Sequence, residues 1–289
     1  MRVIEFYKQN KEPVFSFEFF LPKTPEAKDG FLKTLAEVKA LAPHFVTLTY
    51  GAAGSSRQST VEMAGLLKNK YGFETVMHLT SIAHTRSDID GILAQARKLN
   101  IENIMALRGD LPKDGPVVAL EQRDFKYATD LVRHLRQNNN WCIGVAGYPE
   151  GHTEAVSRQQ DILRLKEKVD AGADYIATQL FFDNRDYFRF VDEARAAGIL
   201  APIVPGIMPI TNFHQIQKFA AMCGAKIPAD LSDRLSRVHD DAQAVVNIGI
   251  EHAAHQCADL LAKGVPGIHF YTLNRARSAQ EILSRIKRL

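Results

Sequence analysis

A single glutamate, Glu18, stands inside a run of aromatic residues and is the strongest candidate for chemistry in this chain. Residues 15–20 read FSFEFF, the pattern of an apolar strand. An apolar environment disfavours the charged form of a carboxyl group and raises its pKa, which suits a proton donor near neutral pH. We therefore predict that Glu18 is a general acid. The alternative is a structural glutamate at the solvent edge of a strand, paired with a lysine or an arginine.

Further polar side chains collect where other apolar segments end. They are Thr49 with Tyr50, His78 with Thr80, Arg108 with Gly109 and Asp110, Tyr148 with Glu150, Gln179, and Tyr271 with Asn274 and Arg275. Each of them taken singly has a structural explanation, such as capping a loop. Burying a polar group without a partner costs about 1 to 3 kcal/mol, so their joint presence favours a functional site.

The elements that would position these residues alternate regularly along the chain. We predict strands at 14–19, 45–49, 75–80, 103–108, 142–148, 174–180, 202–207 and 267–271, and helices at 26–41, 58–70, 88–99, 124–138, 155–170, 185–197, 211–222, 228–263 and 275–287. This alternation predicts an α/β fold, a single-domain (β/α)8 TIM barrel over residues 1–289. Active sites of such barrels lie at the carboxyl ends of the strands, where the polar residues fall.

Several classes of protein are disfavoured by the sequence. No G-x-G-x-x-G follows the first strand, and no Walker pattern is present. Glu18, His78, Asp110 and His152 could be imagined as metal ligands, but H-x-H and H-E-x-x-H spacings are absent, so we expect no metal. A net charge of +3 with dispersed basic residues argues against nucleic acid. Three scattered cysteines and the lack of a long apolar run lead us to expect a cytoplasmic protein that does not bind a membrane.

Taken together, these motifs resemble the methylenetetrahydrofolate reductase family along nearly the whole chain. The matching blocks are FSFEFFLPKT at 15–24, FVTLTYGA at 45–52, HLT at 78–80, ALRGDLP at 106–112, GYPEGH at 147–152, KVDAGADYIATQLFFDN at 168–184, PGIMPITNF at 205–213 and HFYTLNRA at 269–276. The resemblance is to the short bacterial form without a C-terminal regulatory domain. It implies FAD as cofactor, NADH or NADPH as hydride donor, and reduction of 5,10-methylenetetrahydrofolate to 5-methyltetrahydrofolate for methionine synthesis. It also leads us to expect a homo-oligomer acting on small molecules.

The resemblance also implies roles for individual residues. Glu18 would protonate the folate, and Asp110 would lie beside the flavin and hold the pterin. Flavin contacts are implied at Thr49, Tyr50, Ala52, His78, Arg108, Gly109, Asp110, Tyr148, His152, Ala155, Asp161, Arg164 and Lys168. Substrate contacts are implied at Glu18, Asp110, Gln179, Gln215, Phe219, Tyr271 and Arg275. Because no glycine loop is available for the diphosphate, cationic Arg108 and Lys168 are suited to neutralise it.

Two positions depart from the bacterial pattern, and several alternatives stay open. Arg164 stands where an asparagine is common and Glu167 where an arginine is common, which leaves the FAD contacts in this part undetermined. The choice between NADH and NADPH is not decided by the sequence. Rival functions are another barrel flavoenzyme resembling proline dehydrogenase, a metal-dependent barrel hydrolase, and a folate-binding protein without turnover. The colour of the protein and its response to nicotinamide would separate them.

Overall fold

Eight parallel strands form the centre of the molecule. The computed structural model describes residues 1–289 apart from 10, 23, 51–56, 111–118, 139–140 and 287–289. The strands are β1 Val14–Phe19, β2 Phe45–Leu48, β3 Thr75–Thr80, β4 Asn103–Leu107, β5 Cys142–Gly147, β6 Tyr175–Leu180, β7 Ile203–Ile207 and β8 Gly267–Tyr271. They pair in chain order, and β8 pairs with β1 to close the barrel. The predicted (β/α)8 barrel is confirmed.

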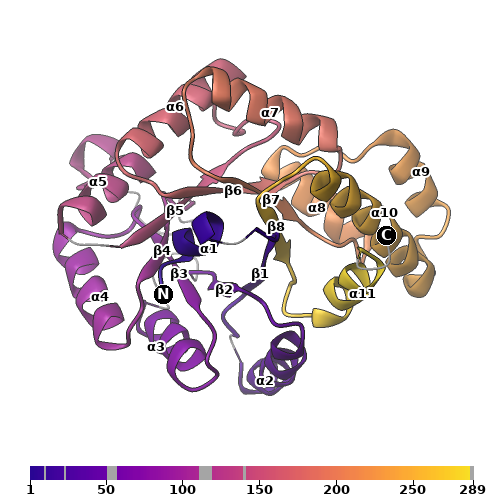
Figure 1. Ribbon diagram of the computed structural model, residues 1–289, viewed down its shortest axis with the longest axis horizontal. Coiled ribbons are helices and arrows are strands. Elements are labelled where there is room, and N and C mark those ends of the chain that lie inside the picture. The colour runs from indigo at the N-terminus through magenta and orange to yellow at the C-terminus, as the bar shows by residue number, and fades with distance from the viewer. Residues whose placement is uncertain (10, 23, 51–56, 111–118, 139–140, 287–289) are drawn as a thin grey trace.

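Helices surround this barrel (Figure 1). They are α2 Pro25–Ala40, α3 Arg57–Asn69, α4 Arg86–Lys98, α5 Ala128–Asn138, α6 Arg158–Asp170, α7 Asn184–Ala196, α8 Phe213–Cys223, α9 Ala229–Ser236, α10 Ala242–Ala262 and α11 Ala276–Ile286, with a 3-10 turn at Leu120–Gln122. The single helical tract predicted at 228–263 is wrong, because it consists of α9 and α10. Asp241 caps α10 by accepting hydrogen bonds from the N–H groups of Gln243 and Ala244, so a new helix begins there. None of the described helices is long and apolar enough to cross a membrane.

A short helix that the sequence analysis did not predict, α1 Val3–Gln9, fills the N-terminal end of the barrel. In Figure 1 it lies over the centre of the ring of strands. The Val3 N–H donates to Asn103 Oδ1 at 2.7 Å, at the start of β4. The Tyr7 ring lies 5.8 Å from the Tyr175 ring inside the barrel. Side chains therefore close this end.

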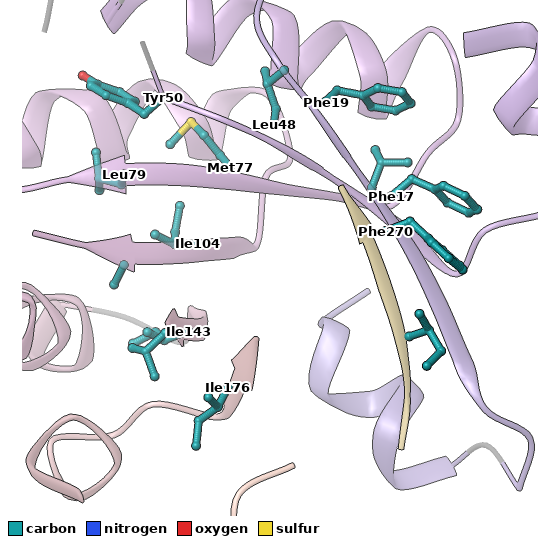
Figure 2. Packing of buried hydrophobic residues seen from close by; sticks show 14 of the residues in the cluster. Phe17, Phe19, Leu48, Tyr50, Met77, Leu79, Ile104, Ile143, Ile176 and Phe270 are labelled. Atoms are coloured by element: carbon teal, nitrogen blue, oxygen red, sulfur yellow. The ribbon is translucent and has the colours of Figure 1, made fainter. Parts of the chain in front are cut away.

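Alternation along β1 separates the residues of the aromatic run onto two faces. Successive side chains of a strand point to opposite faces. Phe17 and Phe19 pack with the layer of apolar residues shown in Figure 2, between the barrel and the helices. Ser16 lines the barrel interior, and Glu18 lies on the same face of the strand. The flanking phenylalanines thus point away from the Glu18 carboxyl group.

Candidate active site

The predicted polar residues collect at one rim of the barrel. Glu18, His78, Gln179 and Tyr271 lie near the ends of β1, β3, β6 and β8; Thr49 and Tyr50 follow β2, Arg108 to Asp110 follow β4, and Tyr148 follows β5. All eight strands run parallel, so these positions share the carboxyl end of the barrel. The structure thus places these residues together at that rim.

Glu18 is almost fully buried, with 7% of its surface exposed. Its Oε2 lies 3.3 Å from Thr47 Oγ1, 3.4 Å from His78 Nε2 and 3.5 Å from His269 Nε2. The other ring nitrogen of His269, Nδ1, lies 2.8 Å from Ser16 Oγ. A hydroxyl group, an imidazole and a carboxyl group therefore form a continuous chain of contacts inside the barrel.

These neighbours reverse the direction in which the pKa of the Glu18 carboxyl group was expected to shift. Burial favours the neutral form of Glu18, but the hydrogen bond from His269, the positive potential of His78 and His269, and the Thr47 hydroxyl outweigh it. The pKa of Glu18 therefore lies below its ordinary value. The predicted rise is wrong for this arrangement, because the aromatic neighbours in sequence occupy the opposite face of β1 and imidazoles occupy its own face. Burial also lowers the pKa of His78, in spite of the nearby Glu18 carboxylate.

His269 is a site residue that the sequence analysis missed. Among the histidines only His78 was predicted at a strand end, although HFY at 269–271 belongs to a predicted strand. The strand period of two places His269 on the same face as Tyr271, and the register pairs Ser16 with His269 and Glu18 with Tyr271. The alternation was readable from sequence, but the pairing of β8 with β1 in this register was not.

Tyr271 forms the wall next to His269. Its ring meets the His269 ring edge-on, with centroids 5.0 Å apart. The Tyr271 hydroxyl donates to the carbonyl oxygen of Thr178 at 2.6 Å. Gly206 makes this position possible, because a Cβ there would lie 2.6 Å from the Tyr271 ring and 2.3 Å from the Thr178 carbonyl oxygen. Burial, followed by the Glu18 charge, raises the pKa of Tyr271 well above its ordinary value.

Arg108, which follows β4, forms a bidentate ion pair with Glu154. Its two terminal nitrogens lie 2.6 and 2.7 Å from the Glu154 carboxylate oxygens. The hydrogen bond with Glu154 raises the pKa of Arg108, and the charge of Asp110 adds to the rise. Burial raises the pKa of Tyr148, and the charge of the exposed Asp110 carboxylate adds to the rise. Arg108, Asp110 and Tyr148 therefore share one part of the rim. The sequence analysis did not identify Glu154 as a partner of this cation.

Lys168 supplies a second cation from the last turn of α6. Its Nζ donates to the Ala146 carbonyl oxygen at 2.6 Å and lies 6.0 Å from the centre of the Tyr148 ring. Burial lowers the pKa of Lys168 to about 8, against the opposing effect of the Asp161 charge. Asp161 in turn accepts the His152 N–H at 3.2 Å. The structure therefore brings together four of the predicted flavin residues.

Arg164, Ala155 and Ala52 are three further residues predicted to contact the flavin. Arg164 is exposed, pairs with Glu167 at 2.9 Å and lies over the Tyr127 ring at 5.7 Å. The two positions that depart from the bacterial pattern thus pair with each other. The Ala155 N–H bonds the His152 carbonyl oxygen at 2.9 Å. Ala52 lies outside the described residues.

Tyr50 and Thr49 support the rim through different contacts. The Tyr50 side chain packs in the outer layer of Figure 2, and its hydroxyl lies 2.8 Å from His84 Nε2. The Thr49 N–H donates to the Phe19 carbonyl oxygen at 2.9 Å. The Tyr50 ring therefore belongs to the outer apolar layer.

The other predicted substrate residues are Phe219, Gln215, Arg275 and Gln179. Phe219 of α8 and Tyr271 both pack against the same apolar cluster. Gln215, on the same helix, and Arg275, just before α11, are exposed. The Gln179 side chain folds back so that its Oε1 accepts the Leu180 N–H at 2.9 Å. Exposed polar groups and a half-buried ring thus border the rim on this side.

The rim combines groups that suit proton transfer and anion binding. A buried carboxyl group touching imidazoles can exchange a proton with a bound substrate. Two cations, Arg108 and Lys168, can hold a phosphate-bearing ligand. Within the described part of the chain, no group of three or more His, Cys, Asp or Glu side chains is arranged to hold a metal ion.

Comparison with known proteins gives a consistent result. The family model described as methylenetetrahydrofolate reductase matches residues 3–287. A 5,10-methylenetetrahydrofolate reductase of Escherichia coli (strain K12) is 40% identical over 267 residues, covering 92% of this chain and 88% of that protein. Methylenetetrahydrofolate reductase (NADH) 1 of Arabidopsis thaliana is 39% identical over 300 residues, covering 99% of this chain. The alignment covers 51% of the Arabidopsis protein, so this chain spans about half the length of such relatives.

A solved structure supports the fold independently of sequence. It is an uncharacterized protein from Clostridium thermocellum described as binding two copies of 5-methyl-5,6,7,8-tetrahydrofolic acid. It superposes with a TM-score of 0.64 over 98% of this chain and 97% of that chain. The sequence identity is 14%, so this likeness concerns the fold alone.

Proposed function

The chain belongs to the methylenetetrahydrofolate reductase family, and from this premise we propose that it reduces 5,10-methylenetetrahydrofolate to 5-methyltetrahydrofolate. The observation that carries the proposal is the buried Glu18 carboxyl group at the carboxyl end of the barrel, in contact with His78, His269 and Thr47. We propose NADH as the donor, since the names of the plant relatives include it. The methyl product would serve methionine synthesis.

The cations of the rim fit FAD. Lys168 is held by one carbonyl oxygen and Arg108 by an exposed carboxylate, so both can turn to a diphosphate. Backbone of Thr49, Tyr50 and Gly109 would complete the cradle, with Ala52, His78, Asp110, Tyr148, His152, Ala155, Asp161 and Arg164 as the other predicted contacts. When bound there, FAD would accept hydride from the nicotinamide and supply it to the folate.

Glu18 would open the imidazolidine ring of the substrate. Its carboxyl proton passes to a ring nitrogen, the carbon–nitrogen bond breaks, and the one-carbon unit becomes an iminium cation that accepts the hydride. The carboxylate that remains is stabilised by the Thr47 hydroxyl and by His78 and His269. His269, whose Nε2 lies 3.5 Å from the carboxylate, would return the proton. Covering the rim with the pterin would remove water from Glu18 and raise its pKa.

The remaining predicted residues would bind the substrates. Asp110 would hold the pterin and lie beside the flavin, where its negative charge favours the cationic intermediate of the folate. Tyr271 and Phe219 offer ring surfaces on one side, and Gln179 offers an amide. Gln215 and Arg275 are exposed where the tail of the folate would leave the barrel, and Arg275 suits its carboxylates.

The visible spectrum of the purified protein tests this function. Under anaerobic conditions we expect a yellow protein that is bleached by NADH and recoloured by methylenetetrahydrofolate, with 5-methyltetrahydrofolate found by chromatography. NADPH in a parallel cuvette measures the donor preference. A colourless protein that cannot be loaded with FAD would refute the proposal. Bleaching by proline instead of a nicotinamide would support the proline dehydrogenase alternative.

A further inference from the structure

The connection between β8 and α11 has an unfavourable backbone conformation directly beside Glu18. Leu273 has a φ of 50° and Asn274 a φ of 58°, so two consecutive residues other than glycine are left-handed. This region brings the Cβ of an L-residue close to its own carbonyl oxygen. Asparagine tolerates the conformation, but leucine seldom adopts it. Such outliers persist only where surrounding contacts fix them, and they cluster at functional sites.

Three side-chain hydrogen bonds tie this connection to the end of β1, and the Thr34 hydroxyl of α2 donates to the Asn274 carbonyl oxygen at 3.0 Å. The Thr272 hydroxyl donates to the carbonyl oxygen of Glu18 at 2.6 Å. The Asn274 side chain accepts the Phe20 N–H at 2.8 Å and donates to the Phe20 carbonyl oxygen at 2.9 Å. The last backbone pair of the two strands is Glu18 with Tyr271. The side chains of Thr272 and Asn274 thus extend the hydrogen bonding between β1 and β8 beyond the last backbone pair, which contains Glu18.

The Glu18 carboxyl group is sensitive to such support. Its contacts with Thr47, His78 and His269 measure 3.3 to 3.5 Å, which is long for hydrogen bonds. A small displacement of the backbone would therefore break them. On the other edge of β1 the Thr49 N–H bonds the Phe19 carbonyl oxygen at 2.9 Å, so the strand end is held from both sides.

We infer that Thr272 and Asn274 are positioning residues that hold the backbone of Glu18 so that its carboxyl group meets the imidazoles and the substrate. This inference rests on the proposed function for the identity of the substrate, but not for the geometry. The left-handed Leu273 is the consequence, since the chain must turn sharply between the two contacts. A displacement of about 1 Å in a catalytic group can lower a rate by about a hundredfold.

Asn274→Gly isolates the side-chain contacts from the backbone conformation. Glycine adopts the left-handed region freely, so the turn is kept while both bonds to Phe20 are lost. Asn274→Asp keeps the acceptor for the Phe20 N–H and loses only the donor. Asn100→Gly is the matched control: Asn100 is also left-handed, with a φ of 60°, but lies in the α4–β4 connection at the other end of the barrel.

The first measurement follows Glu18 itself in protein freed of flavin. Carboxyl 13C NMR gives its titration, with His78 of β3 and His269 and Tyr271 of β8 as the titratable groups facing it. Loss of the imidazole contacts should raise the pKa of Glu18 in Asn274→Gly by about half a unit or more. Asn100→Gly should leave it unchanged. An unchanged titration in Asn274→Gly would overturn the inference.

The second measurement separates the two half-reactions of the flavin-loaded protein by stopped flow. Reduction by NADH requires no acid, so Asn274→Gly should keep it within about twofold, whereas reoxidation by methylenetetrahydrofolate should slow about tenfold or more. Asn274→Asp should fall in between, and Asn100→Gly should match the wild type. Equal slowing of both half-reactions would show a merely structural role. Wild-type protein that is not reoxidised by the folate would refute the proposed function alone, because the NMR comparison still judges the positioning.

Discussion

The two halves of the barrel interior differ sharply in chemistry. The N-terminal half is filled by the buried apolar and aromatic side chains of Val14, Phe45, Val76 and Tyr175, together with Val3 and Ile4 of α1. The C-terminal half carries Glu18, Thr47, His78 and His269, which are just as buried. A polar cluster is stable there because its members are partners of one another. The polar cluster therefore lies between this apolar end and the rim, where we propose that the substrate binds.

Glu18→Gln should have the largest effect, because it removes the proton while keeping the shape of the side chain. General acid catalysis contributes about 10² to 10⁴ in rate, so we expect reoxidation of the reduced flavin by methylenetetrahydrofolate to fall about a thousandfold. Reduction by NADH should remain near the wild-type rate. Stopped-flow absorbance of each half-reaction measures both.

The control for this change is Glu37→Gln, the same substitution at an exposed position of α2. It should leave both half-reactions unchanged. Equal slowing of the two half-reactions by Glu18→Gln would contradict the general-acid role of Glu18, because only the reaction with the folate needs an acid.

Lys168→Met should weaken FAD binding about tenfold at pH 7, since it removes a cation that we assign to the diphosphate. The pKa of Lys168 is about 8, so the ammonium is charged below this pH and neutral above it. Wild-type affinity for FAD should therefore fall as the pH rises from 7 to 9.5, and affinity of the variant should not. Quenching of flavin fluorescence measures the dissociation constant.

Lys166→Met gives the matched comparison on the same helix. Lys166 pairs with Asp170, one turn further along α6, and takes no part in the rim. We expect its FAD affinity and pH dependence to equal those of the wild type. Equal weakening by both substitutions would mean that only the net charge matters, and that Lys168 makes no specific contact.

The fold was largely predictable from sequence because its signal is local. Each strand is a short β-branched or aromatic run followed by an amphipathic helix, and eight such units close a barrel. The prediction failed where a local signal was weak. Helix α1 has seven residues, too few for a clear period, and the Asp241 cap was hidden inside a long helical pattern.

The position of the candidate residues in the fold was predictable from sequence, but their environment was not. Strand ends could be located, so Glu18, His78 and Tyr271 were placed at the rim correctly. The pKa of Glu18 depends on which side chains face it from neighbouring strands, and His269 comes from a strand 251 residues away. The register that pairs Ser16 with His269 is set by barrel closure. Sequence neighbours such as Phe17 and Phe19 were therefore misleading, because they belong to the other face.

His269→Leu sharpens the comparison by making the polar half resemble the apolar half. It removes the hydrogen bond and the positive potential that hold the pKa of Glu18 down, so that pKa should rise. The acid acts when protonated, so reoxidation by the folate declines as the pH rises through this pKa. In the variant, the pH at which the rate of reoxidation declines should therefore be higher. Rates measured from about pH 4 to pH 9 locate this declining limb of the pH profile in both proteins, because the pKa of wild-type Glu18 lies below its ordinary value.

The control for this shift is His255→Leu on the exposed face of α10. It should leave the limb where it is in the wild type. A limb that stays in place, or moves to lower pH, in His269→Leu would contradict the assignment of His269 as the group that stabilises the Glu18 carboxylate.

Tyr7→Phe should have the smallest effect and tests the apolar half. The Tyr7 hydroxyl is buried and has no hydrogen-bond partner among the described residues. Removing an unsatisfied buried hydroxyl relieves a desolvation penalty, so the free energy of unfolding should stay the same or increase by up to about 1 kcal/mol. In Tyr187→Phe, by contrast, the lost hydroxyl donates to the Ile203 carbonyl oxygen at 2.7 Å, and we expect a decrease of about 1 kcal/mol. Urea denaturation followed by circular dichroism measures both, and a loss of stability in Tyr7→Phe as large as in Tyr187→Phe would show that the N-terminal half is not the apolar plug described above.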